Sequence, residues 1–562
     1  MPAHRPAPVP QPTQLSWRPG HFTLDATTTV RSAPGARPAL DLLRTLLAPA
    51  TGLPLPPSPE GQFVLALDPQ LRGLGEEGYG LTVGPDALLL RAAHLTGLLR
   101  GVQTVRQLLP VRALSDQPQP DTPWELPCAE ITDVPQSAWR GFMLDVARHF
   151  QPAGVLRRYV DLLALHKMNV LHLHLTDDQG WRMPVAAYPR LTEVGGRRAQ
   201  SMVGPAGAAR GTGDLTFDGV PHQGAYTRAE LRHLVTYAAA RGVTVMPEME
   251  MPGHVRAALA AYPELGNTPG RRLDVWTRWG VCDTVLGVGD PVLDFCRTVL
   301  DEVLDVFPSP HVHIGGDECP TTEWAASPAA RARAVAERLP DTGALREWFL
   351  GRIGAHLIER GRTPTAWAET GEGLPPEFTV MTWRDPEHTR IALKRGHAVV
   401  SCHHRAAYLD YPQSHAPTEP PGQPGAVVDL RSVHAHEAGY GPDTAESTGG
   451  SGGPGSSEHF GSPSGSECSG TSDGPGTPDP PGQLLGLQAQ LWTEFAPTAD
   501  HVDYLTFPRL CALADRAWHG AAPWPGVHAR LRAHAARLAA LGLRHGPLDD
   551  PYSPAPKASP AP

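Results

Sequence analysis

Lysine is almost missing from this chain of 562 residues, and no stretch of the chain is apolar enough to cross a membrane. The lysines are Lys167, Lys394 and Lys557, so nearly all positive charge is arginine, which reflects a composition bias and not chemistry. A formal net charge of −10 and an isoelectric point near 6.2 disfavour a nucleic-acid or polyanion binder. With no run approaching the length of a membrane span, we expect neither nucleic acid nor membrane as a partner.

Cysteine is sparse as well, and its pattern excludes two kinds of site. The seven cysteines are scattered, odd in number and without a CxxC pair, which fits free thiols better than disulfides or zinc ligands.

The N-terminal sequence MPAHRPAPVPQPTQLSW has no apolar core of the kind a signal peptide needs. We therefore expect a cytoplasmic monomer or homodimer, with secretion left open if the start codon is misassigned.

Low-complexity sequence lies at the two ends and in one internal tract. Residues 1–13 and 547–562 are rich in proline and are predicted to be disordered tails. The tract at about 440–482 has almost no apolar residues and is predicted to be a flexible loop inserted into a domain. Between the tails we expect a non-catalytic α+β domain over residues 14–135 and a larger catalytic domain over residues 136–546.

The smaller domain has mixed secondary-structure signals. HFTLDATTTVR (21–31) and QFVLALD (62–68) are predicted strands, and residues 36–52 a helix that ends at a glycine. GYGLTVGPDALLLRAA (78–93) is typical of a hairpin, and LTGLLRGVQTVRQLLP (95–110) of an amphipathic helix stopped by its proline. This mixture predicts a small α+β fold.

From about residue 136 onward, short apolar strands alternate with helical segments. Parallel strands joined by helical crossovers predict an α/β fold of the (β/α)8 TIM-barrel type. An open doubly wound sheet is the alternative, but no GxGxxG follows the first strand. The eight predicted strands span residues 140–147, 169–176, 243–249, 311–315, 363–367, 378–383, 397–402 and 484–492.

Polar and aromatic residues gather where these strands end, which in such a barrel is the face that carries the active site. Acids combined with aromatic rings favour a carbohydrate site, because a sugar ring stacks on indole while its hydroxyls bond to carboxylate and guanidinium groups. In strand order the ends carry Asp145 and Arg148, Asp177 and Asp178, Glu248, Glu250 and His254, Asp317 and Glu318, Trp367, Trp383, Tyr408 and Asp410, and Trp492 and Glu494.

The segments that carry these residues resemble those of one enzyme family. WRGFMLDVARHFQP, NVLHLHLTDDQGWR, PEMEMPGH, HIGGDE, AYLD and LWTE occur in the order and spacing of the family 20 glycoside hydrolases, the β-N-acetylhexosaminidases. EGYGLTV and GLLRGVQTVRQLL resemble the non-catalytic domain that precedes the barrel in that family. The resemblance implies an exo-acting hydrolase that removes terminal, non-reducing β-linked GlcNAc, with GalNAc as an open alternative. The substrates it implies are GlcNAc-containing oligosaccharides or glycoconjugates, and it implies no metal and no cofactor.

The resemblance also implies a retaining, substrate-assisted mechanism, in which the 2-acetamido group attacks the anomeric carbon and forms an oxazolinium intermediate. Glu318 would be the general acid and then the base, and Asp317 would hold the acetamido N–H while Tyr408 donates to its carbonyl oxygen. We expect burial and the charge of Asp317 to raise the pKa of Glu318.

The remaining roles follow from the same resemblance. Asp177 and His254 would orient Glu318. The sugar would be held by Trp367, Trp383 and Trp492 around the acetamido group, by Arg148 and Glu494 at the 3- and 4-hydroxyls, and by Asp410 near the 6-hydroxyl.

Two other functions compete with this prediction. His172 and His174, like His311 and His313, put two rings on one face of a strand, as in metal-dependent amidohydrolases. Polar packing inside a barrel explains the pairs better. A catalytically dead glycan-binding module is the third possibility, and the presence of every expected acid disfavours it.

Overall fold

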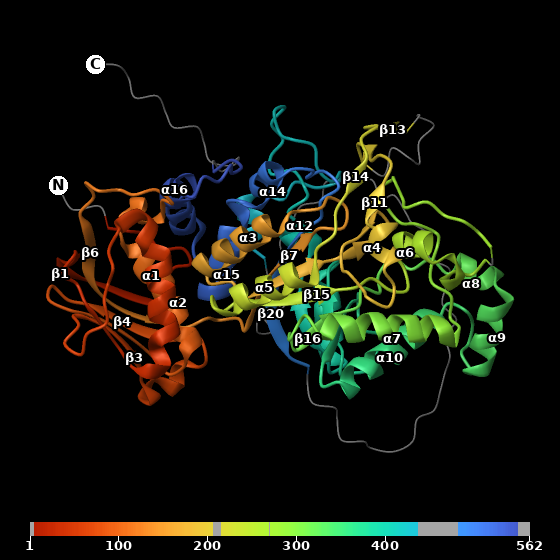
Figure 1. Cartoon of the computed structure of the whole chain (residues 1–562), viewed down its shortest axis with the longest axis horizontal. Helices are drawn as coiled ribbons and strands as arrows, with labels where there is room; N and C mark the ends of the chain where they lie inside the picture. The colour runs from red at the N-terminus through yellow and green to blue at the C-terminus, as the bar shows by residue number, and fades with distance from the viewer. Residues whose placement is uncertain (1–4, 206–214, 269, 437–481, 549–562) are drawn as a thin grey trace, which may run out of the picture.

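The protein consists of a mixed β-sheet with two helices and a closed β-barrel surrounded by helices, as the computed structural model shows (Figure 1). Residues 5–205, 215–268, 270–436 and 482–548 are described. Apart from Gly482, the predicted insertion at 440–482 lies outside the described residues, and so does most of the predicted C-terminal tail.

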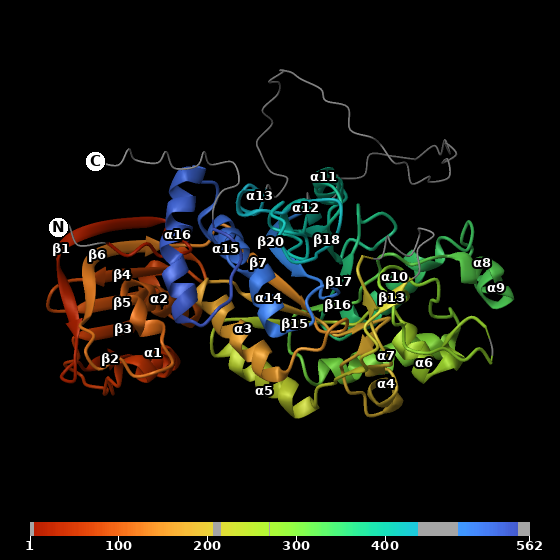
Figure 2. The same ribbon diagram turned by 90° about the horizontal axis from the view of Figure 1, so that it is seen from above.

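The N-terminal sheet has the strand order β1-β6-β4-β5-β3-β2. Its strands are β1 (Gln14–Leu24), β2 (Val30–Ser32), β3 (Phe63–Leu67), β4 (Tyr79–Val83), β5 (Leu88–Ala92) and β6 (Trp124–Asp133). Helices α1 (Arg37–Thr51) and α2 (Leu95–Leu108) pack together beside the sheet, on the side of the barrel (Figures 1 and 2). Nearly every residue of α2 is buried, because it lies between the sheet and barrel helix α3 (Ala153–Leu165).

The predicted helices and the hairpin of this domain are confirmed, but the single strand predicted over residues 21–31 is wrong. A turn at Asp25 divides it, because the Asp25 Oδ1 atom accepts from the backbone N–H of Thr27 at 2.8 Å. The chain then enters β2, which pairs with β3 in parallel. Strand β6, which pairs with both β1 and β4, was not predicted from the sequence.

The prediction of a disordered tail over residues 1–13 is wrong for residues 5–13, which are described and bonded to the rest of the molecule. Val9 is fully buried, and its backbone N–H and C=O both bond to the side chain of Gln107. The backbone N–H of Gln11 donates to Asp515 at 2.7 Å. Proline-rich composition predicted disorder, but the partners that order this segment come from distant parts of the chain.

The barrel closes from eight parallel strands, in the order β15-β16-β17-β18-β19-β20-β7-β8. This confirms the predicted (β/α)8 fold and the position of each predicted strand. The strands are β7 (Trp139–Asp145), β8 (Val170–His174), β15 (Thr244–Glu248), β16 (His311–His313), β17 (Thr363–Trp367), β18 (Thr379–Thr382), β19 (Ala398–Ser401) and β20 (Leu484–Leu491).

Amphipathic helices cover the outside of the barrel and bury their apolar faces against its strands. They include α3, α5 (Arg228–Ala239), α7 (Asp290–Leu304), α10 (Leu345–Glu359), α11 (Pro386–Lys394), α14 (Ala499–Thr506) and α15 (Arg509–His519). Helix α16 (Trp524–Ala540) instead packs against α15 and against Val111–Leu114 of the small domain. Helix α5 begins at a capping box, in which Thr227 and Glu230 bond to each other's backbone N–H. Within the described residues, no helix combines the length and the apolar character needed to cross a lipid bilayer.

A buried ion pair joins the small domain to the barrel. Lys167, at the end of α3, places its Nζ atom 2.6 Å from Oδ2 of Asp133 on β6, and both side chains are fully buried. The hydroxyl of Tyr79 and the indole N–H of Trp518 also donate to Asp133, at 2.6 and 2.7 Å. Charges this deep are tolerated only when they are paired and hydrogen-bonded, so the four side chains fix the two bodies together.

Candidate active site

The two adjacent acids Asp317 and Glu318 follow strand β16 at a turn that glycine makes possible. Gly315 and Gly316 have φ angles of +66° and +99°, and Glu318 itself has φ +42°, which is uncommon outside glycine. A Cβ atom at Gly315 would lie only 1.8 Å from Oε2 of Glu250. The turn separates the two acids: the Oδ1 atom of Asp317 is buried, whereas the side chain of Glu318 keeps a third of its surface exposed.

The predicted site residues converge around this pair. One hollow, with a volume of about 590 Å³, is lined by Arg148, Asp177, His254, Asp317, Glu318, Trp383, Tyr408, Asp410, Trp492 and Glu494. Of the predicted set only Trp367 is absent from that lining, and it lies in the wall of an adjoining hollow. The strand ends therefore bring the predicted residues together at one face of the barrel.

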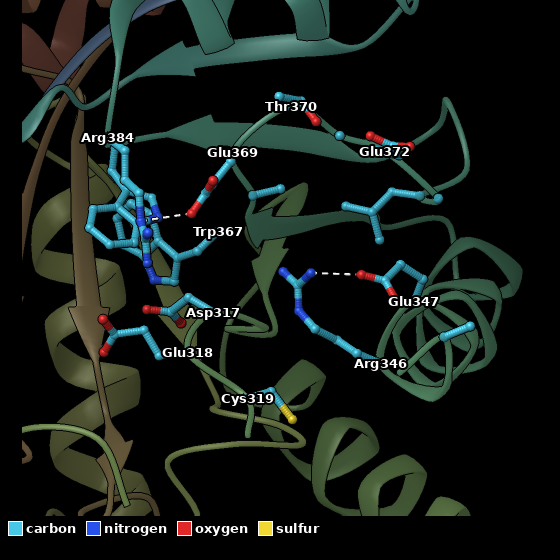
Figure 3. A pocket seen from close by; sticks show the side chains of 16 residues that line it. Asp317, Glu318, Cys319, Arg346, Glu347, Trp367, Glu369, Thr370, Glu372 and Arg384 are labelled. Atoms are coloured by element: carbon cyan, nitrogen blue, oxygen red, sulfur yellow. Dashed lines mark hydrogen bonds and ion pairs between the residues drawn. The ribbon is translucent and has the colours of Figure 1, made fainter. Parts of the chain in front are cut away.

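The adjoining hollow has a volume of about 600 Å³ and shares Asp317, Glu318 and Trp383 with the first. Its wall also carries two ion pairs, Arg384 with Glu369 and Arg346 with Glu347, each at 2.7 Å (Figure 3). The acidic pair thus stands at the boundary of two spaces. This arrangement suits a substrate whose scissile bond lies at Glu318, with one part in each hollow.

Four aromatic rings form a cup beside Asp317. The ring centroids lie 6.1 Å apart for Trp367 and Trp492, 6.1 Å for Trp492 and Tyr408, and 6.3 Å for Tyr408 and Trp383. The rings of Trp383 and Tyr408 are nearly parallel, at 15°. Such a cup offers apolar walls together with one phenolic hydroxyl, which suits a small group with both an apolar end and a polar end.

His254 connects Glu318 to two buried aspartates. Its Nδ1 atom lies 3.2 Å from Asp178 and 3.4 Å from Asp177, and its Nε2 atom lies 3.7 Å from Oε2 of Glu318. Burial alone would lower the pKa of His254, but Asp177 and its other acidic neighbours raise it well above its ordinary value. For Asp177, burial opposes ionisation, yet Arg148 and His254 hold its pKa well below its ordinary value.

The expectation that the pKa of Glu318 is raised is wrong. Burial does push the pKa of Glu318 upward, but His254, Arg384 and Arg148 outweigh burial and bring it below its ordinary value. The predicted upward shift applies instead to Asp317, whose pKa is raised by burial and by the charge of Glu318. Burial and the charge of Asp317 were expected to set the pKa of Glu318, whereas the cations that lower it come from other loops.

Arg148 is held rigidly from three sides. Its guanidinium lies 2.8 Å from Asp177 and 3.5 Å from Asp145, and it donates to the Gln179 side chain at 3.1 Å. It also lies over the ring of Trp492, with its Cζ atom 4.9 Å from the centroid. A fixed guanidinium can recognise neighbouring hydroxyls without first losing conformational freedom.

Several buried carboxyl oxygens of the site have no hydrogen-bond donor within the described part of the chain. They are Oδ1 of Asp317, Oδ1 of Asp410, Oε2 of Glu250 and Oε2 of Glu494. Burial raises the pKa of Asp410 well above its ordinary value, and the adjacent Glu494 adds to this. Buried acceptors without donors are rare in folded proteins, so this cluster is matched to a ligand that brings several N–H or O–H groups.

Sequence reasoning missed several residues of the site. Trp276 and Trp279 line the first hollow from the loop between β15 and α7, where no motif or spacing indicated them. Gln179 and Glu250 lie inside recognised motifs, yet no role was predicted for them.

The His-x-His pairs divide between two places. His172, His174 and His313 surround the carboxylate of Glu248 inside the barrel, at 3.1, 2.6 and 2.7 Å. His311 instead packs edge-on against Trp139, with ring centroids 5.1 Å apart. The atoms of His172, Glu248 and His313 lie close enough together to hold a metal ion, but the short contacts to Glu248 favour polar packing inside the barrel.

Comparison with known proteins places the chain in one family. Residues 138–521 match the model for the catalytic domain of glycosyl hydrolase family 20, and residues 6–134 match the model for domain 2 of that family. The chain is 34% identical over 481 residues to a beta-hexosaminidase of Akkermansia muciniphila, covering 84% of this chain and 85% of the relative. It is 30% identical over 559 residues to a beta-N-acetylhexosaminidase of Cellulomonas fimi, covering 96% and 95%.

Solved structures show the same likeness over both domains. The N-acetyl-beta-hexosaminidase of Streptomyces plicatus in complex with Thio-NAglucal superposes with a TM-score of 0.76. It is 29% identical in sequence, and the match covers 97% of each chain. An exo beta-N-acetylglucosaminidase of Vibrio harveyi in complex with N-acetylglucosamine has a TM-score of 0.78 at 26% identity, covering 98% of this chain and 80% of the other.

Proposed function

Because the chain belongs to glycosyl hydrolase family 20 and is a glycoside hydrolase, we propose that it removes terminal β-linked GlcNAc as an exo-acting β-N-acetylhexosaminidase. The observation that carries the proposal is the position of Asp317 and Glu318 at the boundary of two hollows, beside the aromatic cup. The terminal sugar occupies the first hollow, and the leaving group occupies the second.

In the first step, the acetamido carbonyl oxygen of the substrate attacks the anomeric carbon as the glycosidic bond breaks. Glu318 donates a proton to the leaving oxygen. The unpartnered Oδ1 atom of Asp317 accepts the acetamido N–H, and the Tyr408 hydroxyl donates to the carbonyl oxygen. These contacts turn the acetamido group toward the anomeric carbon and stabilise the positive charge of the oxazolinium ion that forms.

In the second step, the carboxylate of Glu318 takes a proton from water as the water oxygen attacks the anomeric carbon. The bond to the acetamido oxygen breaks, and the acetamido group is restored. Two displacements on opposite faces of the same carbon leave its β configuration unchanged. Because the nucleophile belongs to the substrate, the enzyme needs only one carboxyl group that moves a proton, which explains the unequal environments of the two acids.

Glu318 needs a proton at the start of the first step, although the cations around it lower its pKa. His254, whose pKa is raised well above its ordinary value, is positioned to supply that proton across the 3.7 Å that separate the two side chains. A bound sugar shields the exposed part of Glu318 from water, which disfavours its charged form. We therefore treat His254 and Glu318 as a coupled pair that carries one proton.

The ring hydroxyls of the terminal sugar satisfy the remaining acceptors. Glu494 and Asp410 each line the first hollow with a buried oxygen that has no donor among the described residues, and Arg148 supplies donors beside them. A site built around unpaired acceptors rejects analogues that lack the matching hydroxyl much more strongly than an apolar pocket does. The orientation of the 4-hydroxyl, which distinguishes GlcNAc from GalNAc, is read at this end of the site.

Hydrolysis of three p-nitrophenyl glycosides tests the proposed function. The β-GlcNAc substrate should be cleaved efficiently, the β-glucoside should be cleaved negligibly, and the β-GalNAc substrate reports the discrimination at the 4-hydroxyl. Turnover of the β-glucoside comparable to that of β-GlcNAc would contradict the acetamido-assisted mechanism.

A further inference from the structure

The carboxylate of Glu248 lies inside the barrel beneath the aromatic cup, and the proposed mechanism does not use it. Glu248 is the last residue of β15 and is fully buried. Its two oxygens point to two different parts of the site. Because the side chain has no access to water, each of its partners must come from the protein.

One oxygen of Glu248 bonds to Trp367, one of the four rings of the cup. The indole N–H of Trp367 donates to Oε1 of Glu248 at 2.6 Å. The ring of Trp367 is almost completely buried and faces Trp492, at a centroid distance of 6.1 Å. An indole has a single polar group, so this hydrogen bond determines how the ring is turned about its side-chain bonds.

The other oxygen of Glu248 bonds to His174, which packs against Trp492, another ring of the cup. The Nδ1 atom of His174 lies 2.6 Å from Oε2 of Glu248, and its Nε2 atom lies 2.9 Å from Oδ2 of Asp177. The His174 ring also packs edge-on against Trp492, with centroids 4.9 Å apart. Burial would lower the pKa of His174, but Glu248 and Asp177 raise it well above its ordinary value, so the ring donates at both nitrogens.

A neutral amide cannot replace this carboxylate. Trp367 and His174 both require an acceptor, and His313 also lies 2.7 Å from Oε1. A glutamine has one carbonyl oxygen and one NH₂ group, so while His174 keeps both of its ring protons, one of the donors would face another donor. Buried donors that face each other move apart or remain without an acceptor. Either outcome lets the ring of Trp367 or of Trp492 change its orientation.

We propose that Glu248 is a positioning residue that fixes Trp367 and Trp492 as the walls of the acetamido pocket, and so determines which N-acyl groups the enzyme accepts. The inference rests on the proposed function, because it assigns the aromatic cup to the acetamido group. A rigid cup admits the methyl group of an acetamide and excludes one further methylene. A loosened cup admits both, but holds the acetamide less well for attack on the anomeric carbon.

The test compares kcat/KM for two p-nitrophenyl substrates, one with the natural 2-acetamido group and one with a 2-propionamido group. In Glu248→Gln, we expect the preference for acetamido over propionamido to fall by about tenfold, the size of effect that one methylene has in a fixed pocket. For the acetamido substrate, kcat should fall by a larger factor than KM rises. Reduced folding stability alone lowers the active fraction of enzyme, and with it the apparent kcat for both substrates alike, so it leaves the preference unchanged.

Two further variants serve as controls. Trp367→Phe keeps an aromatic ring but removes the N–H donor, so it should lower the preference equally, and its combination with Glu248→Gln should add little. Asp503→Asn removes another buried carboxylate, which accepts from Tyr159 at 3.1 Å and pairs with Arg158 at 2.7 Å on the outer helices. Asp503→Asn should lower the melting temperature without changing the preference.

An unchanged preference in folded Glu248→Gln would overturn the inference. If that variant does not fold, an unchanged preference in Trp367→Phe overturns it instead. A wild-type enzyme that cleaves the β-glucoside as fast as β-GlcNAc contradicts the proposed function itself. Strong acetamido dependence in the wild type, with an unaltered preference in both variants, contradicts only the role of Glu248.

Discussion

The Nε2 atom of His254 lies 3.7 Å from Oε2 of Glu318, while the other nitrogen of the His254 ring faces two buried aspartates. This relationship places a positively charged ring beside the group that delivers a proton in the proposed mechanism. The aspartates keep the ring charged, and the charged ring lowers the pKa of Glu318. The proton affinity of the acid is therefore set by several residues together.

The pH dependence of catalysis should reflect this shared proton. Because the pKa of His254 is raised, the pair keeps its proton as pH rises past the ordinary histidine value, and kcat/KM should fall only above that value. In His254→Gln, Glu318 must hold the proton alone with Arg384 and Arg148 still nearby. The alkaline limb of kcat/KM should then move to lower pH by about one unit or more. If kcat/KM falls at the same alkaline pH in His254→Gln and in the wild type, the two residues do not share a proton.

Replacement of Glu318 should affect substrates according to their leaving groups. Glu318→Gln cannot protonate the leaving oxygen, so we expect kcat for an alkyl or sugar leaving group to fall by about a thousandfold. A dinitrophenyl leaving group departs without a proton, and its release in the first step should change far less. Steady-state and burst kinetics on both substrates make the comparison, and binding of the GlcNAc product should be retained. An equal loss in both first steps would mean that Glu318 is not the general acid.

Replacement of Asp317 should affect the acetamido group specifically. Asp317→Asn keeps the size of the side chain but removes the charge that the oxazolinium ion requires, so kcat for β-GlcNAc should fall by about a hundredfold or more. Any slow background cleavage of the β-glucoside should stay unchanged, because that substrate has no acetamido group. Asp385, an exposed N-cap of helix α11, provides a control in Asp385→Asn, whose kinetics should match those of the wild type. A proportional loss on both glycosides would contradict the proposed role of Asp317.

The buried pair of Lys167 and Asp133 should dominate the stability of the contact between the domains. Asp133→Asn leaves the Lys167 charge buried without a partner, so the free energy of unfolding should fall by about 3–5 kcal/mol. The pKa of Asp133 is lowered in the folded protein, so its stabilising effect is complete at neutral pH and is lost as pH falls through that lowered pKa. Denaturant unfolding measures both effects. Glu130 is exposed on the same strand, so Glu130→Gln should neither lower the free energy of unfolding nor change its dependence on pH. Equal stability of Asp133→Asn and Glu130→Gln would contradict this interpretation.

The barrel and the position of the two adjacent acids were predictable because local sequence determines them. Apolar runs of strand length fixed the eight strands, and the residues after each strand had to meet at one face. The Gly315-Gly316 turn is also local, since both residues adopt positive φ angles. For the same reason the hairpin of β4 and β5 followed from its turn residues.

The electrostatics of the site were not predictable in this way. The pKa of Glu318 depends on Arg384 and His254, which reach it from other loops, so burial and the charge of Asp317 alone gave the wrong direction. The contacts of Glu248 arise only when β8 and β16 lie beside β15, and β17 lies beside β16, in the closed barrel. Residues 5–13 are ordered for a similar reason, because Val9 bonds to a side chain of helix α2.

If the acetamido group of the substrate is the nucleophile, the electron density on its carbonyl oxygen must control the rate. A series of p-nitrophenyl substrates with increasingly fluorinated acetamido groups varies this electron density. Each fluorine withdraws electrons from the carbonyl oxygen while changing its size only slightly. If that oxygen attacks the anomeric carbon, kcat/KM falls with each fluorine, by about a hundredfold or more across the series. Values of kcat/KM that stay level or rise across the series would contradict the account.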